Sequence, residues 1–294
     1  MKILVLGGTG MLGHKIVQAM EQQGMLVSCT FRGRRSDFPV KKIPFFNLVE
    51  VHEYVDATDL PALRSLLAKI SPDYVINCIG IIKQRSEASA AIPSITVNSL
   101  LPHLLAEWAQ DWGGKVIHFS TDCVFSGNKG NYTIYDDSDA EDLYGKSKYL
   151  GEVQQPNALT IRSSIIGREL SNFASLVEWF LSQGGRTISG YTHAMYSGMT
   201  TQTMADLVVA VVNRGEDLSG LQQVVSEKIS KYDLLTALRD GFGLDVTIKP
   251  NDEVVCDRSM CGSGFEKMLD FVVPSWAEQI KRMAEDPTPY GDWR

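Results

Sequence analysis

The chain has 294 residues, 44% hydrophobic and 21% charged, which fits one large α/β domain or one domain with a smaller appendage. Its net charge of −7 excludes the broad basic surface of a nucleic-acid-binding protein, so an anionic ligand needs local positive groups or backbone amides. Five cysteines without a CxxC pair, no signal peptide and no apolar run long enough for a membrane span predict a reduced, cytoplasmic protein without a membrane partner.

The first 120 residues alternate short apolar runs with helical stretches. Strands are predicted at 2–6, 25–31, 49–56, 74–78 and 115–120, and helices at 13–23, 60–70 and 98–112. The strand runs lack polar alternation, which is typical of strands covered on both faces. This order predicts βαβ units around a parallel sheet.

The pattern changes after residue 120. Residues 126–143 are rich in Gly, Asn and Asp and predict a functional loop, followed by a helix at 144–154 and a strand at 159–162. Later helices are expected near 173–181, 203–213, 230–240 and 276–283. We therefore predict an α/β fold: a Rossmann-type doubly wound parallel sheet over 1–162, and a smaller mixed C-terminal substrate-binding region over 163–294. Some segments of that region are expected to return to the first domain.

The string GGTGMLG, at residues 7–13, directly follows the first predicted strand and opens the first helix. Its glycines satisfy both GxGxxG and GxxGxxG, and a helix N-terminus after such a turn binds pyrophosphate. A purely structural glycine turn is the alternative. We predict a dinucleotide site that contains Gly7, Thr9, Gly10, Met11, Leu12 and Gly13.

The end of the second strand discriminates between the two nicotinamide cofactors. An NAD site usually has Asp or Glu there for the ribose 2′-hydroxyl, but CTFRGRRSD has no acid at 29–36. Arg32, Arg34 and Arg35 can instead pair with a 2′-phosphate, which favours NADPH over NADH. A solvated basic turn is the alternative, and it leaves the missing acid unexplained.

Two more strand ends complete the predicted cofactor site. Asp56 and Ala57 follow the third strand, and Asp56 can accept a hydrogen bond from the adenine amine. Cys78, Ile79 and Gly80 follow the fourth strand, at the carboxyl edge of the sheet where cofactors bind.

The stretch YGKSKYLGE, at residues 144–152, places Tyr144 four residues before Lys148, on one face of a predicted helix. A free tyrosine has a pKa of about 10, and a nearby ammonium lowers it by stabilising the phenolate. The pair is therefore a candidate proton donor with its tuning cation. Lys146 lies on a different face and is expected in solvent. An ordinary charged helix surface is the alternative reading.

Together GGTGMLG, Asp56, NCIG (77–80), STDCVFSG (120–127) and YGKSK resemble an extended short-chain dehydrogenase/reductase. The branch they resemble is the dTDP-4-dehydrorhamnose reductase-like sugar-nucleotide reductases, and DRSM (257–260) is similar to the tail of that group. The resemblance implies that Thr121, Tyr144 and Lys148 are catalytic. Tyr144 and Lys148 also contact the cofactor. It further implies NADPH-dependent reduction of a nucleotide-linked 4-keto-6-deoxy sugar for surface polysaccharide precursors, by a homodimer.

Departures from the pattern keep alternatives open. Cys123 replaces the Glu of the dehydratases, and Cys123 with His193 suggests an epimerase that recycles its cofactor. Ile165 stands where the dehydrorhamnose reductases usually have Trp, which leaves the particular sugar undefined. A non-catalytic nucleotide-binding regulatory subunit is a further alternative. We predict no metal site, because the acids between 136 and 142 are better explained as a solvated loop.

Overall fold

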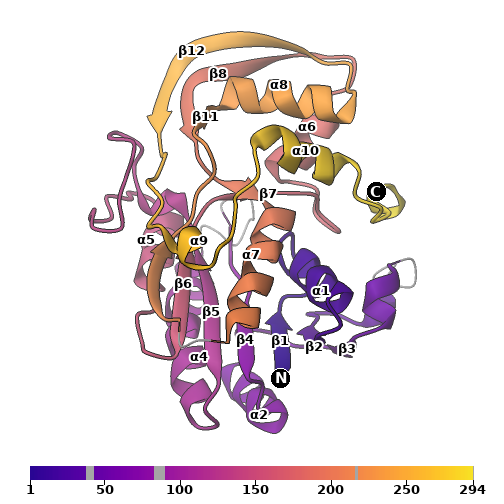
Figure 1. Cartoon of the computed structure of the whole chain (residues 1–294), viewed down its shortest axis with the longest axis vertical. Helices are drawn as coiled ribbons and strands as arrows, with labels where there is room; N and C mark the ends of the chain where they lie inside the picture. The colour runs from indigo at the N-terminus through magenta and orange to yellow at the C-terminus, as the bar shows by residue number, and fades with distance from the viewer. Residues whose placement is uncertain (38–42, 83–89, 216–217, 294) are drawn as a thin grey trace.

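A computed structural model describes residues 1–37, 43–82, 90–215 and 218–293. Its central sheet has seven parallel strands in the order β10-β6-β5-β4-β1-β2-β3 (Figure 1). The strands are β1 Lys2–Leu6, β2 Leu26–Thr30, β3 Glu50–His52, β4 Tyr74–Asn77, β5 Lys115–Ser120, β6 Ala158–Arg162 and β10 Gly220–Gln223. The predicted fold class is confirmed.

Both faces of this sheet are covered by helices. Ile3 and Val5 of β1 pack into one cluster with α1 (Gly13–Gln22) and α7 (Thr201–Arg214). Leu4 and Leu6 pack on the opposite face with α2 (Leu60–Ile70) and α4 (Leu101–Gln110). Because successive strand residues face opposite sides, burial on both sides produces the continuous apolar run KILVL.

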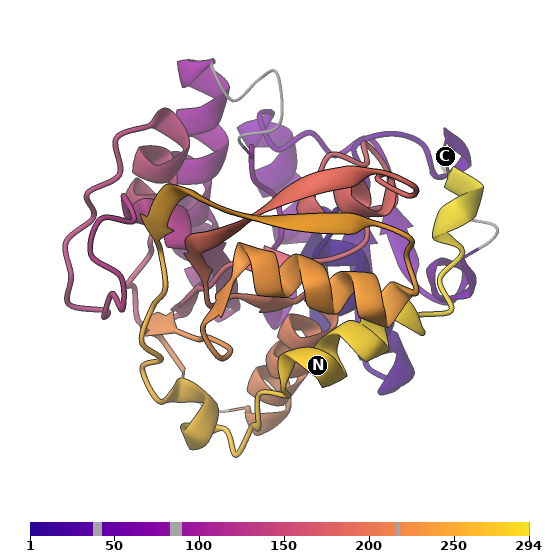
Figure 2. The same cartoon turned by 90° about the horizontal axis from the view of Figure 1, so that it is seen from above.

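A second, smaller unit lies at one end of the sheet (Figure 1). Its strands run in the order β11 (Ile229–Ser230), β8 (Thr187–Tyr196) and β12 (Thr247–Asp257), and β8 is parallel to β12 but antiparallel to β11. Helices α6 (Leu176–Leu181), α8 (Lys231–Phe242) and α10 (Trp276–Ala284) supply its core, and Figure 2 shows α8 alongside these strands. The short strands β7 (Ile165–Ile166) and β9 (Met199–Thr200) pair with each other, and α9 spans Phe265–Met268.

The helix predicted at 98–112 begins earlier than expected. Helical structure starts with α3 (Ala91–Ser94), continues as a π-helical segment, Ile95–Leu100, and then becomes α4. Pro102 has no N–H to donate, so the Asn98 carbonyl lacks its usual partner four residues on. The wider π turn occurs just before this point.

Two other helix boundaries differ for local reasons. Helix α5 (Leu143–Leu150) ends before residue 154, and a Cβ on Gly151 would lie 1.9 Å from the Asn98 carbonyl oxygen. Helix α6 begins at Leu176 rather than near 173 because Asn172 and Phe173 have φ of 69° and 49°, outside the helical region. Among the described residues, no helix is long and apolar enough to cross a membrane.

Candidate active site

The glycine loop connects β1 to α1 at the carboxyl edge of the sheet. Gly7 has a φ of 81°, and a Cβ on Gly13 would lie only 2.1 Å from the Gly7 carbonyl oxygen. Only glycine therefore permits this turn and the close approach of α1. A Cβ on Gly10 would meet just the Gly7 oxygen, at 3.2 Å, so the loop is open on that side. These features fit a pyrophosphate at the helix N-terminus.

The three arginines after β2 lie in different surroundings. Arg32 is exposed and its Nη2 is 3.4 Å from Asp56 Oδ2. Arg34 contacts the Tyr54 hydroxyl, and the Arg35 guanidinium is held by the Phe46 carbonyl and the Asn47 side chain. Arg32 and Asp56 are thus brought together, whereas Arg35 turns toward the segment before β3.

The end of β4 is tied to α5 by Asn98, a residue the motifs did not identify. Its side-chain amide donates to Ile81 O at 3.0 Å and to Ser147 Oγ at 3.1 Å, and its Oδ1 accepts from Ile81 N at 2.9 Å. Cys78 and Ile79 precede this contact, half-buried beside the glycine loop, since Ile79 lies 3.1 Å from a Cβ built on Gly7. Ala57 is buried in the core under α2.

Thr121 and Tyr144 come together although 23 positions separate them in the sequence. Thr121 is buried directly after β5, and its hydroxyl accepts from Cys123 N at 3.2 Å and donates to Asp122 at 3.1 Å. Tyr144 lies in the first turn of α5, which Asp142 caps by accepting from Gly145 N at 2.8 Å. A hydrogen bond with Thr121 acts on the Tyr144 phenol.

The pKa of Tyr144 is raised, not lowered as the Tyr–Lys spacing led us to expect. Burial is the main cause, the nearby Cys123 raises the pKa further, and the hydrogen bond with Thr121 only partly opposes them. Tyr144 is therefore a protonated phenol at neutral pH, suited to donate a proton rather than to accept one.

Lys148, one helical turn after Tyr144, is buried and is held by β5. Its Nζ donates to the Phe119 carbonyl at 2.5 Å and lies 3.4 Å from His118 Nε2. Burial lowers the pKa of Lys148 to about 8, with Glu152 opposing the shift. Burial and Lys148 hold the pKa of His118 well below its usual range, so that ring is neutral. Lys146 is exposed, as expected.

A buried ion pair between Glu152 and Arg162 stabilises the strand ends around Thr121 and Lys148, and no sequence motif marks it. Glu152, just after α5, accepts from Arg162 Nε at 2.8 Å, from Arg162 Nη2 at 2.6 Å and from Ser120 Oγ at 2.6 Å. Arg162 also donates to Gln223 of β10 at 3.2 Å. The pair thus joins the ends of α5, β5, β6 and β10 directly beside Thr121.

The DRSM segment docks onto the loop that follows β5. Asp257 N donates to Gly127 O at 2.7 Å, and Arg258 Nε donates to Phe125 O at 2.9 Å. Arg258 Nη1 lies 3.8 Å from Cys123 Sγ, while His193 is exposed on β8. These contacts bring the motifs STDCVFSG (120–127) and DRSM (257–260) together, although about 130 positions separate them in the sequence.

A cavity of about 320 Å³ opens beside this contact and is lined by Cys123, Phe125, Ser126, Asn128, Ala140, Glu141, Asp142 and Arg258. Lys231, at the start of α8, lies with its Nζ 3.9 Å from the centre of the Tyr196 ring. Burial lowers the pKa of Lys231, and Asp122 and Cys123 oppose the shift. The start of helix α5 therefore lies on one side of the cavity, and the cations Arg258 and Lys231 lie close to it.

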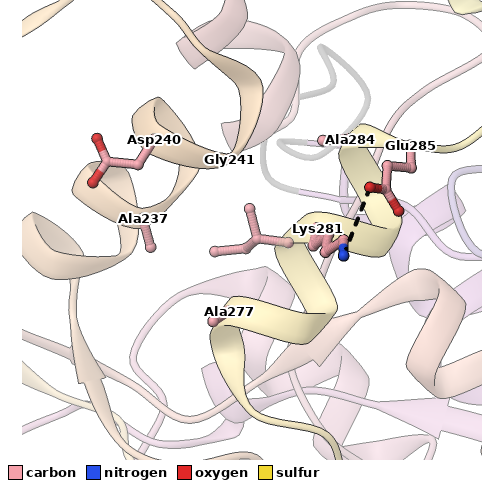
Figure 3. Close-up of a pocket in the computed structure, with 8 residues that line it drawn as sticks. Ala237, Asp240, Gly241, Ala277, Lys281, Ala284 and Glu285 are labelled. Atoms are coloured by element: carbon pink, nitrogen blue, oxygen red, sulfur yellow. Dashed lines mark ion pairs between the residues drawn. The ribbon is translucent and has the colours of Figure 1, made fainter.

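A second groove, between α8 and α10, has no such chemistry. Figure 3 shows Asp240 on one side and the exposed pair Lys281–Glu285, 4.0 Å apart, on the other, with alanines, Gly241 and Ile280 as the rest of the lining. In the described part of the chain, no group of three or more His, Cys, Asp or Glu residues could hold a metal ion. Asp136 instead pairs with Lys129 and Thr133, and Asp139 accepts from Ser126.

The parallel sheet, the glycine loop on its carboxyl edge and the Thr, Tyr and Lys beside it define an extended short-chain dehydrogenase/reductase. Residues 1–287 match the RmlD substrate binding domain family, and the chain belongs to this family. The resemblance inferred from the motifs is thereby confirmed. The individual roles of Thr121, Tyr144 and Lys148 stay predictions.

Two similar proteins have different described roles. The chain is 27% identical over 259 residues to the probable low-salt glycan biosynthesis reductase Agl14 of Haloferax volcanii, covering 84% of this chain and 82% of that protein. It is 25% identical over 265 residues to methionine adenosyltransferase 2 subunit beta of Danio rerio, covering 83% and 74%.

Solved structures share the fold. A hypothetical dTDP-4-dehydrorhamnose reductase from Sulfolobus tokodaii superposes with a TM-score of 0.77 at 23% identity, over 93% of this chain and 96% of that one. The dTDP-4-dehydrorhamnose reductase of Bacillus anthracis in complex with NADP gives 0.77 at 18% identity, over 96% and 98%.

Proposed function

We propose that this protein is an NADPH-dependent reductase of a nucleotide-linked 4-keto-6-deoxy sugar, acting in the synthesis of surface polysaccharide precursors. Membership of the RmlD substrate binding domain family supports a sugar-nucleotide reductase. The observation that carries the proposal is the hydrogen-bonded Thr121–Tyr144 pair on the same sheet edge as the glycine loop, with Lys148 buried one turn further along α5.

The proposed mechanism assigns one step to each side chain. When bound, NADPH supplies the hydride that reduces the carbonyl carbon. Thr121 donates a hydrogen bond to the carbonyl oxygen, and Tyr144 protonates that oxygen as negative charge develops on it. The raised pKa of Tyr144 keeps the proton in place until a much stronger base, the alkoxide, forms. Lys148, while protonated, stabilises the phenolate left behind.

NADPH is preferred over NADH in this proposal because of charge at the end of β2. Arg32 is exposed there, beside Asp56, and Arg34 is exposed two positions on. A 2′-phosphate bound by these side chains would form ion pairs with the guanidinium groups, which a neutral 2′-hydroxyl cannot form.

In this proposal Arg258 and Lys231 bind the diphosphate of the nucleotide sugar. Arg258 lines the cavity beside Cys123, and Lys231 Nζ lies over the Tyr196 ring, with Asp122 as a nearby anion. Both cations are partly shielded from water, so an anionic substrate bound between them would gain from their charge.

The proposal is tested with NADPH and a panel of nucleotide-linked 4-ketosugars, following absorbance of the reduced nicotinamide. Absence of turnover on every sugar, with NADPH bound, refutes it. Tyr144→Phe should lower kcat by about 10²–10⁴-fold with little change in NADPH affinity, because it removes the general acid alone. Tyr149→Phe is the matched control, since Tyr149 is exposed on the same helix.

A nucleotide-binding subunit of another enzyme is the second candidate, favoured by the likeness to methionine adenosyltransferase 2 subunit beta. This function needs no proton donor and no tuning cation. A stable complex with a catalytic partner and no turnover on any ketosugar would support it over the reductase.

We also propose a homodimer through helices of the Rossmann half. The exposed apolar residues Ile92, Ile95, Leu100 and Leu150 lie on three segments that contact one another, α3, the π-helical segment and α5. Sedimentation should give a dimer for the wild type and a monomer for Leu150→Glu, which places a charge in the apolar surface.

A further inference from the structure

A group of polar side chains is buried behind the glycine loop, apart from the Thr121–Tyr144 site. His14 and Lys15 come from the first turn of α1, and Asp286 and Tyr290 come from the segment that follows α10. All four side chains are almost completely shielded from solvent. In Figure 1 this end of the chain lies next to α1. Nothing in the proposed reaction uses these groups.

His14 connects the glycine loop to Tyr290. Its Nδ1 is 2.8 Å from the Gly10 carbonyl oxygen, and its Nε2 is 2.8 Å from the Tyr290 hydroxyl. Burial and the nearby Lys15 lower the pKa of His14 to about 3, so the ring is neutral and carries a single proton. A carbonyl oxygen can only accept, so that proton is on Nδ1. Nε2 therefore accepts from the Tyr290 hydroxyl.

The hydrogen bonds to the Gly10 carbonyl determine the direction of the Met11 N–H. The Gly10 carbonyl accepts from both the His14 backbone N, at 3.1 Å, and the His14 ring. The Met11 N–H belongs to the same trans peptide plane and points in the opposite direction, out of the helix end. No acceptor among the described residues takes that N–H. Since the loop is open at Gly10, the Met11 N–H is presented to an anionic ligand.

Tyr290 is itself fixed by charged neighbours. Lys15 Nζ pairs with Asp286 and donates to Thr288 Oγ1 at 3.1 Å, and Asp286 Oδ2 lies 3.1 Å from the Tyr290 oxygen. The Arg168 guanidinium lies 4.5 Å from the centre of the Tyr290 ring. The hydroxyl has a single proton, which goes to His14 Nε2, the nearer acceptor at 2.8 Å, while Asp286 competes for it.

We propose that Tyr290, acting through His14, is a positioning residue for the cofactor pyrophosphate: it fixes the Gly10–Met11 peptide so that the Met11 N–H meets a phosphate oxygen. The inference rests on the proposed NADPH-dependent function. The C-terminal segment thus takes part in cofactor binding without touching the cofactor.

The test is Tyr290→Phe, which deletes one hydroxyl and keeps the ring between its cationic neighbours. Titration of NADPH by nicotinamide fluorescence should show a dissociation constant raised about three- to tenfold, the worth of one oriented hydrogen bond. Adenosine 2′-phosphate, which lacks the pyrophosphate, should bind both proteins equally in competition. The ketosugar KM and the kcat at saturating NADPH should not change. Tyr191→Phe, at an exposed tyrosine of β8, is the matched control.

Asp286→Asn distinguishes a specific effect of the Tyr290 hydroxyl on cofactor binding from a general loss of stability in the C-terminal segment. It removes the partner of Lys15 but keeps Tyr290 and His14, so Tm should fall while NADPH affinity stays within about twofold of wild type. Unchanged NADPH affinity in Tyr290→Phe overturns the inference, and so does an equal loss in Asp286→Asn. A wild-type protein that does not bind NADPH would instead refute the proposed function.

Discussion

Glu152→Gln tests the buried ion pair beside the active site. The two side chains are 3% and 2% exposed, and Glu152 accepts three hydrogen bonds of 2.6–2.8 Å from Arg162 and Ser120. The substitution keeps the shape but leaves the Arg162 charge buried without its anion. Breaking a buried pair in this way costs about 3–5 kcal/mol of unfolding free energy.

The assay is equilibrium urea unfolding followed by tryptophan fluorescence, with the midpoint and slope compared between variants. Glu285→Gln is the control: its pair with Lys281 is exposed and 4.0 Å long, so the loss should stay below about 0.5 kcal/mol. The double variant Glu152→Leu/Arg162→Met should recover most of the stability, because no buried charge is left over. A loss below about 1 kcal/mol in Glu152→Gln would refute the reasoning.

Three further predictions concern the cofactor and the buried lysine. Gly13→Ala should abolish measurable NADPH binding by fluorescence titration, because the new Cβ would lie 2.1 Å from a backbone oxygen. Arg32→Ala should weaken NADPH about tenfold while NADH changes less than twofold in parallel titrations. The pKa of Lys148 is lowered to about 8, and the ammonium is the active form. Activity, as kcat/KM, should therefore be constant below pH 8 and fall above it; a flat profile to pH 10 would contradict this role.

The elements of the first half were predictable because burial on both faces leaves a contiguous apolar run. The strand at 2–6 was predicted to the residue, and the glycine loop and α1 followed directly from it. β10 was missed because GLQQ contains no such run, and its pairing with β6 joins residues about 60 positions apart. β12 was missed because most of its side chains are exposed, so it has no apolar pattern.

Within the candidate site, only the relative placement of residues on one helix could be predicted from their spacing in the sequence. The separation of four positions from Tyr144 to Lys148 predicts a shared helix face, and the exposure of Lys146 agrees with it. The contact of Lys148 with β5, and the raised pKa of Tyr144, depend on how α5 docks on the sheet and how much water it excludes. No local pattern encodes this docking. The contact of Arg258 with Cys123 likewise spans 135 positions.

Strand β10 and helix α7 both come from beyond residue 162, yet β10 forms one edge of the large sheet and α7 covers the same face as α1. A chain cut after residue 162 would leave β6 as an open edge and uncover the face of α1 that contacts α7. The two halves therefore share one sheet and one core. A chimera joined to a relative at residue 162 would pair β6 with the relative's edge strand and α1 with the relative's helix, so both contacts would have to match.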